Sequence, residues 1–336
     1  MSEPKPTPRQ QLVQMLTSYW TAMSIHVAAK LKLADLIKAG PKTAPQLAEA
    51  TKTHPQALYR LLRALASVEV FSEGKDGKFS MTPMAECLLD VHGSMHAVAL
   101  MMGEEHFRAW CDLLYSVQTG KPAFDHVFGK PIFEFLSSHP EQAKIFDAAM
   151  TGFHGPETQA MIEAYDYTGI NTLVDIGGGN GTVLSAVLNK YPAMKGVLFD
   201  LPGVIERAKK HLADAGLSSR CQTIVGNFFE TAPPGGDAYQ MRHIIHDWTD
   251  EQCHAILGHI RKVIPKNGRL LVIEMVIKLG NVPQPAKWLD LNMLVMPGGR
   301  ERTEAEYREM YAKAGFKLER VVATPTEVSV IEGRPV

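Results

Sequence analysis

The chain has 336 residues, of which 45% are hydrophobic and 21% are charged, and its formal net charge at pH 7 is −1. These fractions are ordinary for a globular protein, so they exclude a chain that is disordered throughout. The balanced charge argues against bulk nucleic acid or an anionic membrane as a partner. The length is sufficient for two domains.

Targeting and metal-binding patterns are sparse. The segment Met1–Arg9 is polar and proline-rich, which predicts no signal peptide, and no apolar run long enough to span a membrane follows. The four cysteines are scattered without a C-x-x-C pair, and no histidine falls in an H-E-x-x-H pattern. We therefore expect a cytoplasmic protein with neither a disulfide scaffold nor a metal site.

A long amphipathic helix is predicted near the N-terminus. Its apolar residues recur at three- and four-residue spacings: Leu12, Met15, Leu16, Tyr19, Trp20, Met23 and Val27. A stripe this wide must be covered, either by the rest of its own domain or by a second subunit. The sequence leaves both readings open.

Two short helices and a hairpin are predicted next. The helices begin at Thr43 and His54, and the hairpin turns at Gly74–Gly77, which is a winged-helix pattern. A DNA-binding version would carry more basic residues than the three between Thr43 and Leu65, which are Lys52, Arg60 and Arg63. We predict a structural or dimerising domain over residues 10–95, with a DNA-binding regulator as the alternative.

Residues 96–165 are predicted to form a helical connector. Within it, Phe146, Met150 and Phe153 lie on one helical face. Aromatic and methionine side chains at this spacing are typical of core packing, but they could also form one wall of a pocket for a flat apolar ligand.

A glycine-rich stretch, Leu173–Gly181, organises the remaining residues 166–336. An apolar strand runs into Asp175 and four glycines, and a helical pattern follows at once. Such a turn lets backbone amides approach a ligand closely. The spacing is G-x-G-x-G with Thr182 in place of a third fingerprint glycine, which disfavours a dinucleotide.

Strands and helices then alternate, which predicts an α/β fold with a doubly wound parallel sheet. Ligands in such folds lie beyond the carboxyl ends of the strands. The later strand ends each carry a polar residue: Asp200, Asn227, His246 and Glu274. Asp200 has the position of a carboxylate that binds both hydroxyls of a ribose, although capping of the next helix is the alternative reading.

His246 is the candidate proton acceptor. Imidazole exchanges protons near neutral pH, but a lone histidine at a strand end is more often structural. Glu274 ends the neighbouring strand, and Glu301 lies in a loop before a helix. A carboxylate bonded to one ring nitrogen would fix the tautomer and stabilise the imidazolium that forms when the other nitrogen is protonated.

Several of these motifs together resemble one family. The motifs are Asp175–Gly181, Phe199–Pro202, Gly226–Phe229, His246–Glu251 and Gly298–Thr303. They resemble those of the S-adenosylmethionine-dependent O-methyltransferases of the caffeic acid/hydroxyneurosporene type. The loop before Gly298, one residue shorter than in plant members, and the chain end at Val336 indicate the bacterial branch. The resemblance implies a Rossmann-like class I fold with an N-terminal winged-helix-like dimerisation domain, and hence a homodimer.

The resemblance also implies roles for individual residues. His246 matches the general base, and Glu274 and Glu301 match the carboxylates that bracket it. The residues implied to bind S-adenosyl-L-methionine, and its product S-adenosyl-L-homocysteine, are Asp175, Gly177, Gly179, Asp200, Leu201, Asn227, Phe228 and Arg242. Plant members have Asp in place of Asn227 and Lys in place of Arg242, which puts the cofactor affinity in question.

The acceptor implied is a small aromatic or polyketide-like metabolite with a hydroxyl group. By position, the residues expected to contact it are Phe146, Met150, Phe153, Asp247, Trp288, Asn292, Met293 and Met296. The alternative is a diverged homologue that binds the cofactor but transfers no methyl group, as in a hydroxylase-like relative. That alternative predicts a damaged His246, Glu274 and Glu301 set, and all three residues are present.

Overall fold

A computed structural model describes residues 6–336. They form two compact units, one of which contains the chain through Cys111 together with Phe133–Gly155. The other contains Asp112–Ile132 and Pro156–Val336. The domain limits expected from the sequence, at residues 95 and 165, stay a prediction. Among the described residues, no helix combines the length and the apolar character needed to cross a bilayer.

The first unit is mainly helical and contains a small antiparallel sheet with the strand order β1-β3-β2. Its elements are α1 (Pro8–Lys30), α2 (Leu33–Lys38), β1 (Lys42–Thr43), α3 (Ala44–Thr51), α4 (Pro55–Ala66), β2 (Ser72–Glu73), β3 (Lys78–Ser80), α5 (Pro83–Cys87), α6 (His96–Gly103), α7 (Glu105–Trp110), α10 (Ile132–Ser138) and the first part of α11 (Pro140–Ala164). Helices α3 and α4 begin after Thr43 and His54, as predicted, and the side chains of both residues cap their helices. The predicted hairpin is also confirmed, because β2 pairs with β3.

The N-terminal half of α1 exposes its apolar residues. Six of them expose at least 50% of their surface: Leu12, Val13, Met15, Leu16, Tyr19 and Trp20. Further along the helix, Ile25 and Ala28 pack into the core of the first unit. The unit therefore does not cover the predicted stripe itself, which is the pattern expected of a contact surface for another chain.

The second unit alternates strands and helices, which confirms the predicted α/β class. Its elements are α8 (Leu113–Thr119), α9 (Ala123–Phe128), the remainder of α11, β4 (Thr172–Ile176), α12 (Thr182–Lys190), β5 (Lys195–Asp200), α13 (Pro202–Asp214), β6 (Cys221–Val225), β7 (Ala238–Arg242), the 3-10 helix η1 (Ile245–Asp247), α14 (Asp250–Val263), β8 (Arg269–Ile277), α15 (Pro285–Val295), β9 (Arg302–Thr303), α16 (Glu304–Lys313), β10 (Phe316–Ala323) and β11 (Val328–Pro335).

The main sheet of this unit has the strand order β10-β11-β8-β7-β4-β5-β6, and β9 pairs with β8. Strands β4 to β8 are parallel, whereas β11 and β10 are antiparallel. The chain moves outward from β4 to β6 and then returns to the other side of β4 as β7. In doubly wound folds, ligands bind beyond the carboxyl ends of the strands at the point where the strand order reverses, which here is next to β4.

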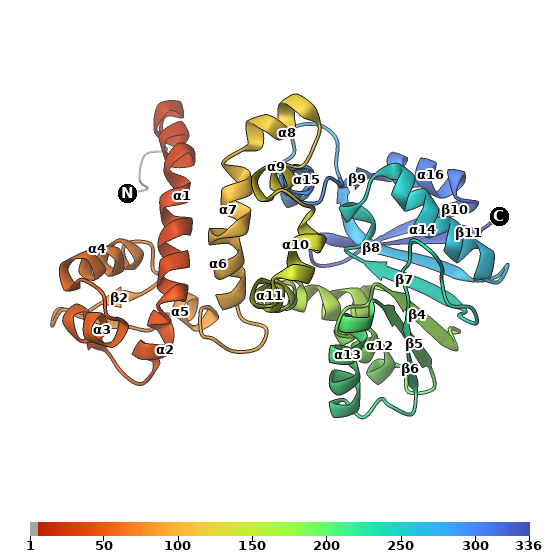
Figure 1. The fold of residues 1–336 in the computed structure, drawn as a ribbon, viewed down its shortest axis with the longest axis horizontal. Coiled ribbons are helices and arrows are strands. Elements are labelled where there is room, and N and C mark those ends of the chain that lie inside the picture. The colour runs from red at the N-terminus through yellow and green to blue at the C-terminus, as the bar shows by residue number, and fades with distance from the viewer. Residues whose placement is uncertain (1–5) are drawn as a thin grey trace. The chain divides into compact units, whose positions relative to one another are not determined.

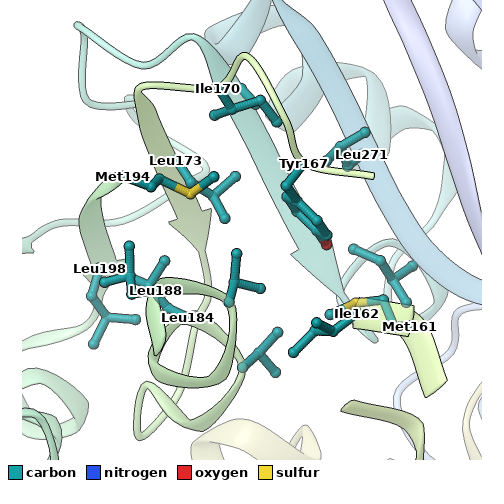
Figure 2. Packing of buried hydrophobic residues seen from close by; sticks show 14 of the residues in the cluster. Met161, Ile162, Tyr167, Ile170, Leu173, Leu184, Leu188, Met194, Leu198 and Leu271 are labelled. Atoms are coloured by element: carbon teal, nitrogen blue, oxygen red, sulfur yellow. The ribbon is translucent and has the colours of Figure 1, made fainter. Parts of the chain in front are cut away.

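Helices cover both faces of this sheet (Figure 1). Residues that alternate along β4 alternate between the two layers: Leu173 packs with α12 and α13, and Val174 packs with α14 and α16. Figure 2 shows the first layer, in which Leu173, Leu184 and Leu198 lie close together. Burial on both faces explains why these strands are nearly continuous apolar runs.

The structure differs from the sequence expectation at two places. The strand expected to run to Ile245 ends at Arg242, because His243 has a left-handed backbone with φ of 53° and the 3-10 helix η1 follows. His246 therefore lies in a short helical turn rather than at a strand end. The second difference is the C-terminal antiparallel pair β10–β11, which the sequence analysis did not predict.

Candidate active site

The glycine loop after β4 forms one side of the site. Gly177 and Gly179 have φ of 65° and 60°, values that residues with a Cβ rarely adopt. A Cβ at Gly177 would lie 2.6 Å from Ile244 Cδ1, whereas one at Gly179 would have no described atom within 4 Å. The loop is thus packed against the protein at Gly177, whereas at Gly179 no described atom fills the space next to the Cα.

Asp200 lies against this loop at the carboxyl end of β5. Its Oδ2 accepts a hydrogen bond of 2.9 Å from the Gly179 N–H, and its Oδ1 accepts one of 2.7 Å from the Leu201 N–H. Asp175 is buried beneath the loop, and burial raises the pKa of its carboxyl to about 7. Asp200 is therefore placed to meet a ligand at the loop, whereas Asp175 supports the loop from below.

Asn227 and Phe228 follow β6 on the same edge of the sheet. The Asn227 side chain accepts a 3.0 Å bond from the Phe229 N–H and donates a 3.2 Å bond to Glu230 Oε1. Phe228 Cε1 would lie 3.5 Å from a Cβ on Gly177, so the aromatic ring lies beside the glycine loop. At the end of β7, Arg242 donates a 2.8 Å bond to Thr158 Oγ1.

His246 lies in η1 and is buried, with a carboxylate on one ring nitrogen. Its Nδ1 is 2.5 Å from Glu301 Oε1, and its Nε2 is 3.6 Å from Asp247 Oδ1. Glu274 instead accepts a 3.0 Å bond from the backbone N–H of His246 and a bond from the Tyr307 hydroxyl. Of the two carboxylates expected around the ring, Glu301 binds a ring nitrogen and Glu274 binds the turn that carries the ring.

The charges around His246 change its basicity. Burial alone would lower the pKa of His246, but the charges of Glu301 and Asp247 and the Glu301 hydrogen bond outweigh it and raise the pKa to about 10. Burial raises the pKa of Asp247 to about 7, with His246 opposing the shift. Burial also raises the pKa of Glu274. The site therefore favours a proton on the imidazole.

A second histidine–carboxylate pair flanks the first. His243 Nε2 is 2.8 Å from Glu157 Oε2, and both side chains are nearly buried. The His243 and His246 rings have centroids 5.0 Å apart. No sequence pattern predicted this pair, which depends on a left-handed backbone at His243 and on Glu157, 86 residues earlier in the chain.

Three other residues that support the site were also missed. Asp290 Oδ1 accepts a 3.0 Å bond from the Glu301 N–H. Tyr307 donates to Glu274, and Arg302 is completely buried directly after Glu301. Arg302 lies within the Gly298–Thr303 motif, but its burial and its contacts depend on residues far away in the chain, which the motif does not reveal.

The residues expected to contact an acceptor fall in both units. In the second unit, α15 carries Trp288, which is 71% exposed, and Met293, which is buried; Met296, directly after the helix, is also buried. Asn292, on the same helix, is half-buried. In the first unit, Phe146 and Met150 pack against a small cluster of Val98, Met101 and Ala149. Phe153 is 41% exposed.

Comparison with known families agrees with this geometry. Residues 110–317 match the model of the O-methyltransferase domain, and residues 13–90 match that of the O-methyltransferase dimerisation domain. The chain belongs to the O-methyltransferase family. It is an enzyme with S-adenosyl-L-methionine as cofactor, and its N-terminal domain is of the dimerisation type.

Two curated relatives illustrate the family. The chain is 43% identical to the phenazine O-methyltransferase PhzM of Lysobacter antibioticus, over 97% of this chain and 96% of that protein. It is 36% identical to the 8-amino-8-demethylriboflavin N,N-dimethyltransferase of Streptomyces davaonensis, over 98% of this chain and 96% of that protein. The family therefore includes enzymes whose acceptor atom is nitrogen.

Two solved structures have the same fold. The mitomycin 7-O-methyltransferase MmcR superposes with a TM-score of 0.92 and 36% identity, covering 98% of each chain. The O-methyltransferase NcsB1, solved with S-adenosylmethionine and 2-hydroxy-5-methyl naphthoic acid, has a TM-score of 0.83 and 33% identity, covering 94% of this chain and 96% of that one. The glycine loop, where no described atom fills the space next to Gly179, and the adjacent Asp200 carboxylate fit S-adenosyl-L-methionine. The methionine part of such a ligand would lie along the loop, and its ribose would meet the carboxylate.

Proposed function

We propose that the enzyme transfers the methyl group of S-adenosyl-L-methionine to a phenolic hydroxyl of a flat aromatic metabolite, with His246 as the general base. The observation that carries the proposal is the 2.5 Å contact between His246 Nδ1 and Glu301 Oε1. Because Glu301 holds the proton of Nδ1, Nε2 is the nitrogen that can accept a proton. The same nitrogen lies next to the carboxylate of Asp247.

The basicity of His246 suits a phenol. When bound, the cofactor supplies an electrophilic sulfonium methyl group. A free phenol has a pKa of about 10, and the pKa of His246 is also about 10, so proton transfer between them is close to balanced. The complex that reacts has lost one proton relative to the complex in which both the His246 imidazolium and the phenol are protonated. That proton is missing either from the ring or from the phenol. A positioned base of this kind contributes about 10²–10⁴-fold to the rate.

The other carboxylates have separate tasks in this proposal. Asp247, at 3.6 Å from Nε2, orients the acceptor hydroxyl toward the base. Glu274 does not exchange protons with the acceptor, because its two bonds hold the backbone of His246 and the hydroxyl of Tyr307. It fixes the turn that carries the base.

The cofactor would be held beyond the carboxyl end of β4. Gly177 and Gly179 would bind its methionine part through their backbone carbonyls, because their N–H groups already donate to the Phe199 carbonyl and to Asp200. Asp175 would support the loop, and Asp200 would bind the ribose. Of the remaining expected contacts, Asn227 and Phe228 would flank the adenine, and Leu201 and Arg242 complete the set. The Asn227 carbonyl keeps an acceptor for an adenine amino group, so the change from Asp leaves this contact available.

The walls of the acceptor site are proposed by position. In the second unit they would come from Trp288, Asn292, Met293 and Met296, on and after α15. The expectation for Phe146, Met150 and Phe153, which belong to the first unit, stays a prediction. We also propose that the enzyme is a homodimer, because the exposed apolar stripe of α1 lies in the dimerisation domain.

A substrate panel tests the reaction. It contains hydroxyphenazines, hydroxybenzoates and hydroxynaphthoates, each matched with the corresponding aromatic amine, because one relative is an N,N-dimethyltransferase. Product formation is read by mass spectrometry as a gain of CH₂. Methylation of hydroxyl compounds supports the proposal, and methylation of the amines alone would replace oxygen by nitrogen as the acceptor atom.

A further inference from the structure

Arg302 directly follows Glu301, between the Gly298–Arg300 loop and α16, and its side chain is completely buried. Its NH1 donates to the carbonyls of Ile245 and Arg300, at 3.2 and 3.1 Å. Its NH2 donates to the carbonyl of Trp248 at 3.2 Å. The carbonyls of Ile245 and Trp248 stand on either side of His246, so one guanidinium holds both ends of the turn that carries the base.

Asp250 completes the arrangement. Its Oδ1 accepts from Arg302 Nε at 3.2 Å and from NH2 at 2.8 Å. Together with the three carbonyls, this gives every N–H of the guanidinium an acceptor. A buried charge is stable only when it is paired and fully hydrogen-bonded, and here both conditions are met.

Two independent contacts hold the same turn. The thiol of Cys253 donates to the carbonyls of Ile245 and Trp248, at 3.3 and 3.5 Å, and lies 3.4 Å from Arg302 NH2. A Cβ at Gly299 would lie 2.0 Å from the His246 carbonyl oxygen, so the loop before Glu301 packs directly onto the turn. The turn and the Glu301 segment therefore move as one piece, with the guanidinium between them.

We propose that Arg302 is a positioning residue, which locks the Ile245–Trp248 turn to the Glu301 segment and so keeps His246 Nδ1 on Glu301. The proposal rests on the proposed role of His246 as the base. An apolar residue could fill the same space, but it could not donate hydrogen bonds to the carbonyls of Ile245 and Trp248. Arg302 acts through His246 and touches neither cofactor nor acceptor.

The test compares Arg302→Lys and Arg302→Ala with Arg300→Ala. Arg300 is a matched control, because it also binds Asp250, at 2.7 Å, but its side chain is exposed. Among the residues that the structure describes, its side chain makes no hydrogen bond to the carbonyls of the turn. Circular dichroism and thermal melting establish that each variant is folded. If the Arg302 variants do not fold, Asp250→Asn replaces them, because it weakens the ion pair between the half-exposed Asp250 and the buried guanidinium.

Three readouts are taken: cofactor affinity by calorimetry, kcat and KM for the acceptor, and the pKa of His246 by NMR of protein labelled with ¹³C-histidine. We expect the Arg302 variants to bind cofactor within about threefold of wild type, to lose at least tenfold in kcat with a smaller change in KM, and to show a His246 pKa lowered by one unit or more. Arg302→Lys should keep more activity than Arg302→Ala, and Arg300→Ala should behave as wild type.

The NMR titration separates this proposal from the proposed function, because it needs no acceptor. A folded Arg302→Lys variant with an unmoved His246 pKa would overturn the positioning role, even if its kcat fell. An active wild-type enzyme with that result would leave the proposed function standing. If no panel compound is methylated but the His246 pKa falls in the Arg302 variants, the positioning of the ring on Glu301 is supported and the proposed acceptor class is not.

Discussion

Replacing Glu301 by glutamine should move the pH dependence of the reaction. In wild type the pKa of His246 is about 10, so at pH 7 roughly one molecule in 10³ has a neutral ring, by the difference of three pH units. The value of kcat/KM should therefore rise about tenfold per pH unit between pH 7 and 9. Glu301→Gln removes the charge that contributes most to raising this pKa. The rise of kcat/KM with pH should then occur at least one pH unit lower than in wild type.

Two opposing changes are expected in this variant. The neutral ring is more abundant at pH 7, but glutamine holds the Nδ1 proton less firmly, so the plateau at high pH should fall by about tenfold or more. Product is measured by mass spectrometry from pH 6.5 to about 11, which extends past the wild-type pKa of His246. One phenol with a pKa of about 10 is used throughout, so that a shift between variants belongs to the enzyme. Glu304→Gln is the control, because Glu304 is an exposed carboxylate three positions along the chain. If kcat/KM rises over the same pH range in wild type and in Glu301→Gln, the role of Glu301 as the partner of His246 Nδ1 is refuted.

Three further results are expected. The raised pKa of His246 stabilises the fold fully below about pH 6.5, the pKa of an unfolded histidine, and that stability is lost as the pH approaches 10. In urea unfolding, the difference in free energy of unfolding between wild type and His246→Gln should shrink by up to about 1.4 kcal/mol per pH unit in that window. A difference that does not change with pH would contradict this expectation. Gly179→Ala should weaken cofactor binding at least tenfold by calorimetry, with about 1–2 kcal/mol of backbone strain and no collision with the described protein atoms; unchanged affinity would show that the loop backbone does not face the cofactor. Replacing both Leu16 and Trp20 by aspartate should give a folded monomer by light scattering, whereas a dimer that persists would place the interface elsewhere.

The sequence could predict the features that depend on local chemistry. The strand, glycine turn and helix between Thr172 and Lys190 follow from an apolar run, positive-φ glycines and a helical period. The position of Asp200 follows from the rule that parallel strands end at the same edge of the sheet. The cap at Thr43 follows from its side chain, which satisfies a free backbone N–H group at a helix start.

The features that the sequence could not predict depend on tertiary contacts. The strand β7 ends at Arg242 although the apolar pattern continues, because His243 adopts a backbone conformation that its neighbours stabilise. The target of Glu274 is a backbone N–H and a tyrosine hydroxyl, which no side-chain spacing reveals. The buried state of Arg302 depends on carbonyls that are more than 50 residues away in the chain.

The central claim, that His246 accepts the proton of the acceptor, is tested most directly by His246→Ala. Cofactor affinity by calorimetry and turnover of a methylated panel compound are measured on the same preparation. The account predicts cofactor binding within about threefold of wild type and turnover reduced at least about 10²-fold. Wild-type turnover in His246→Ala would contradict the claim.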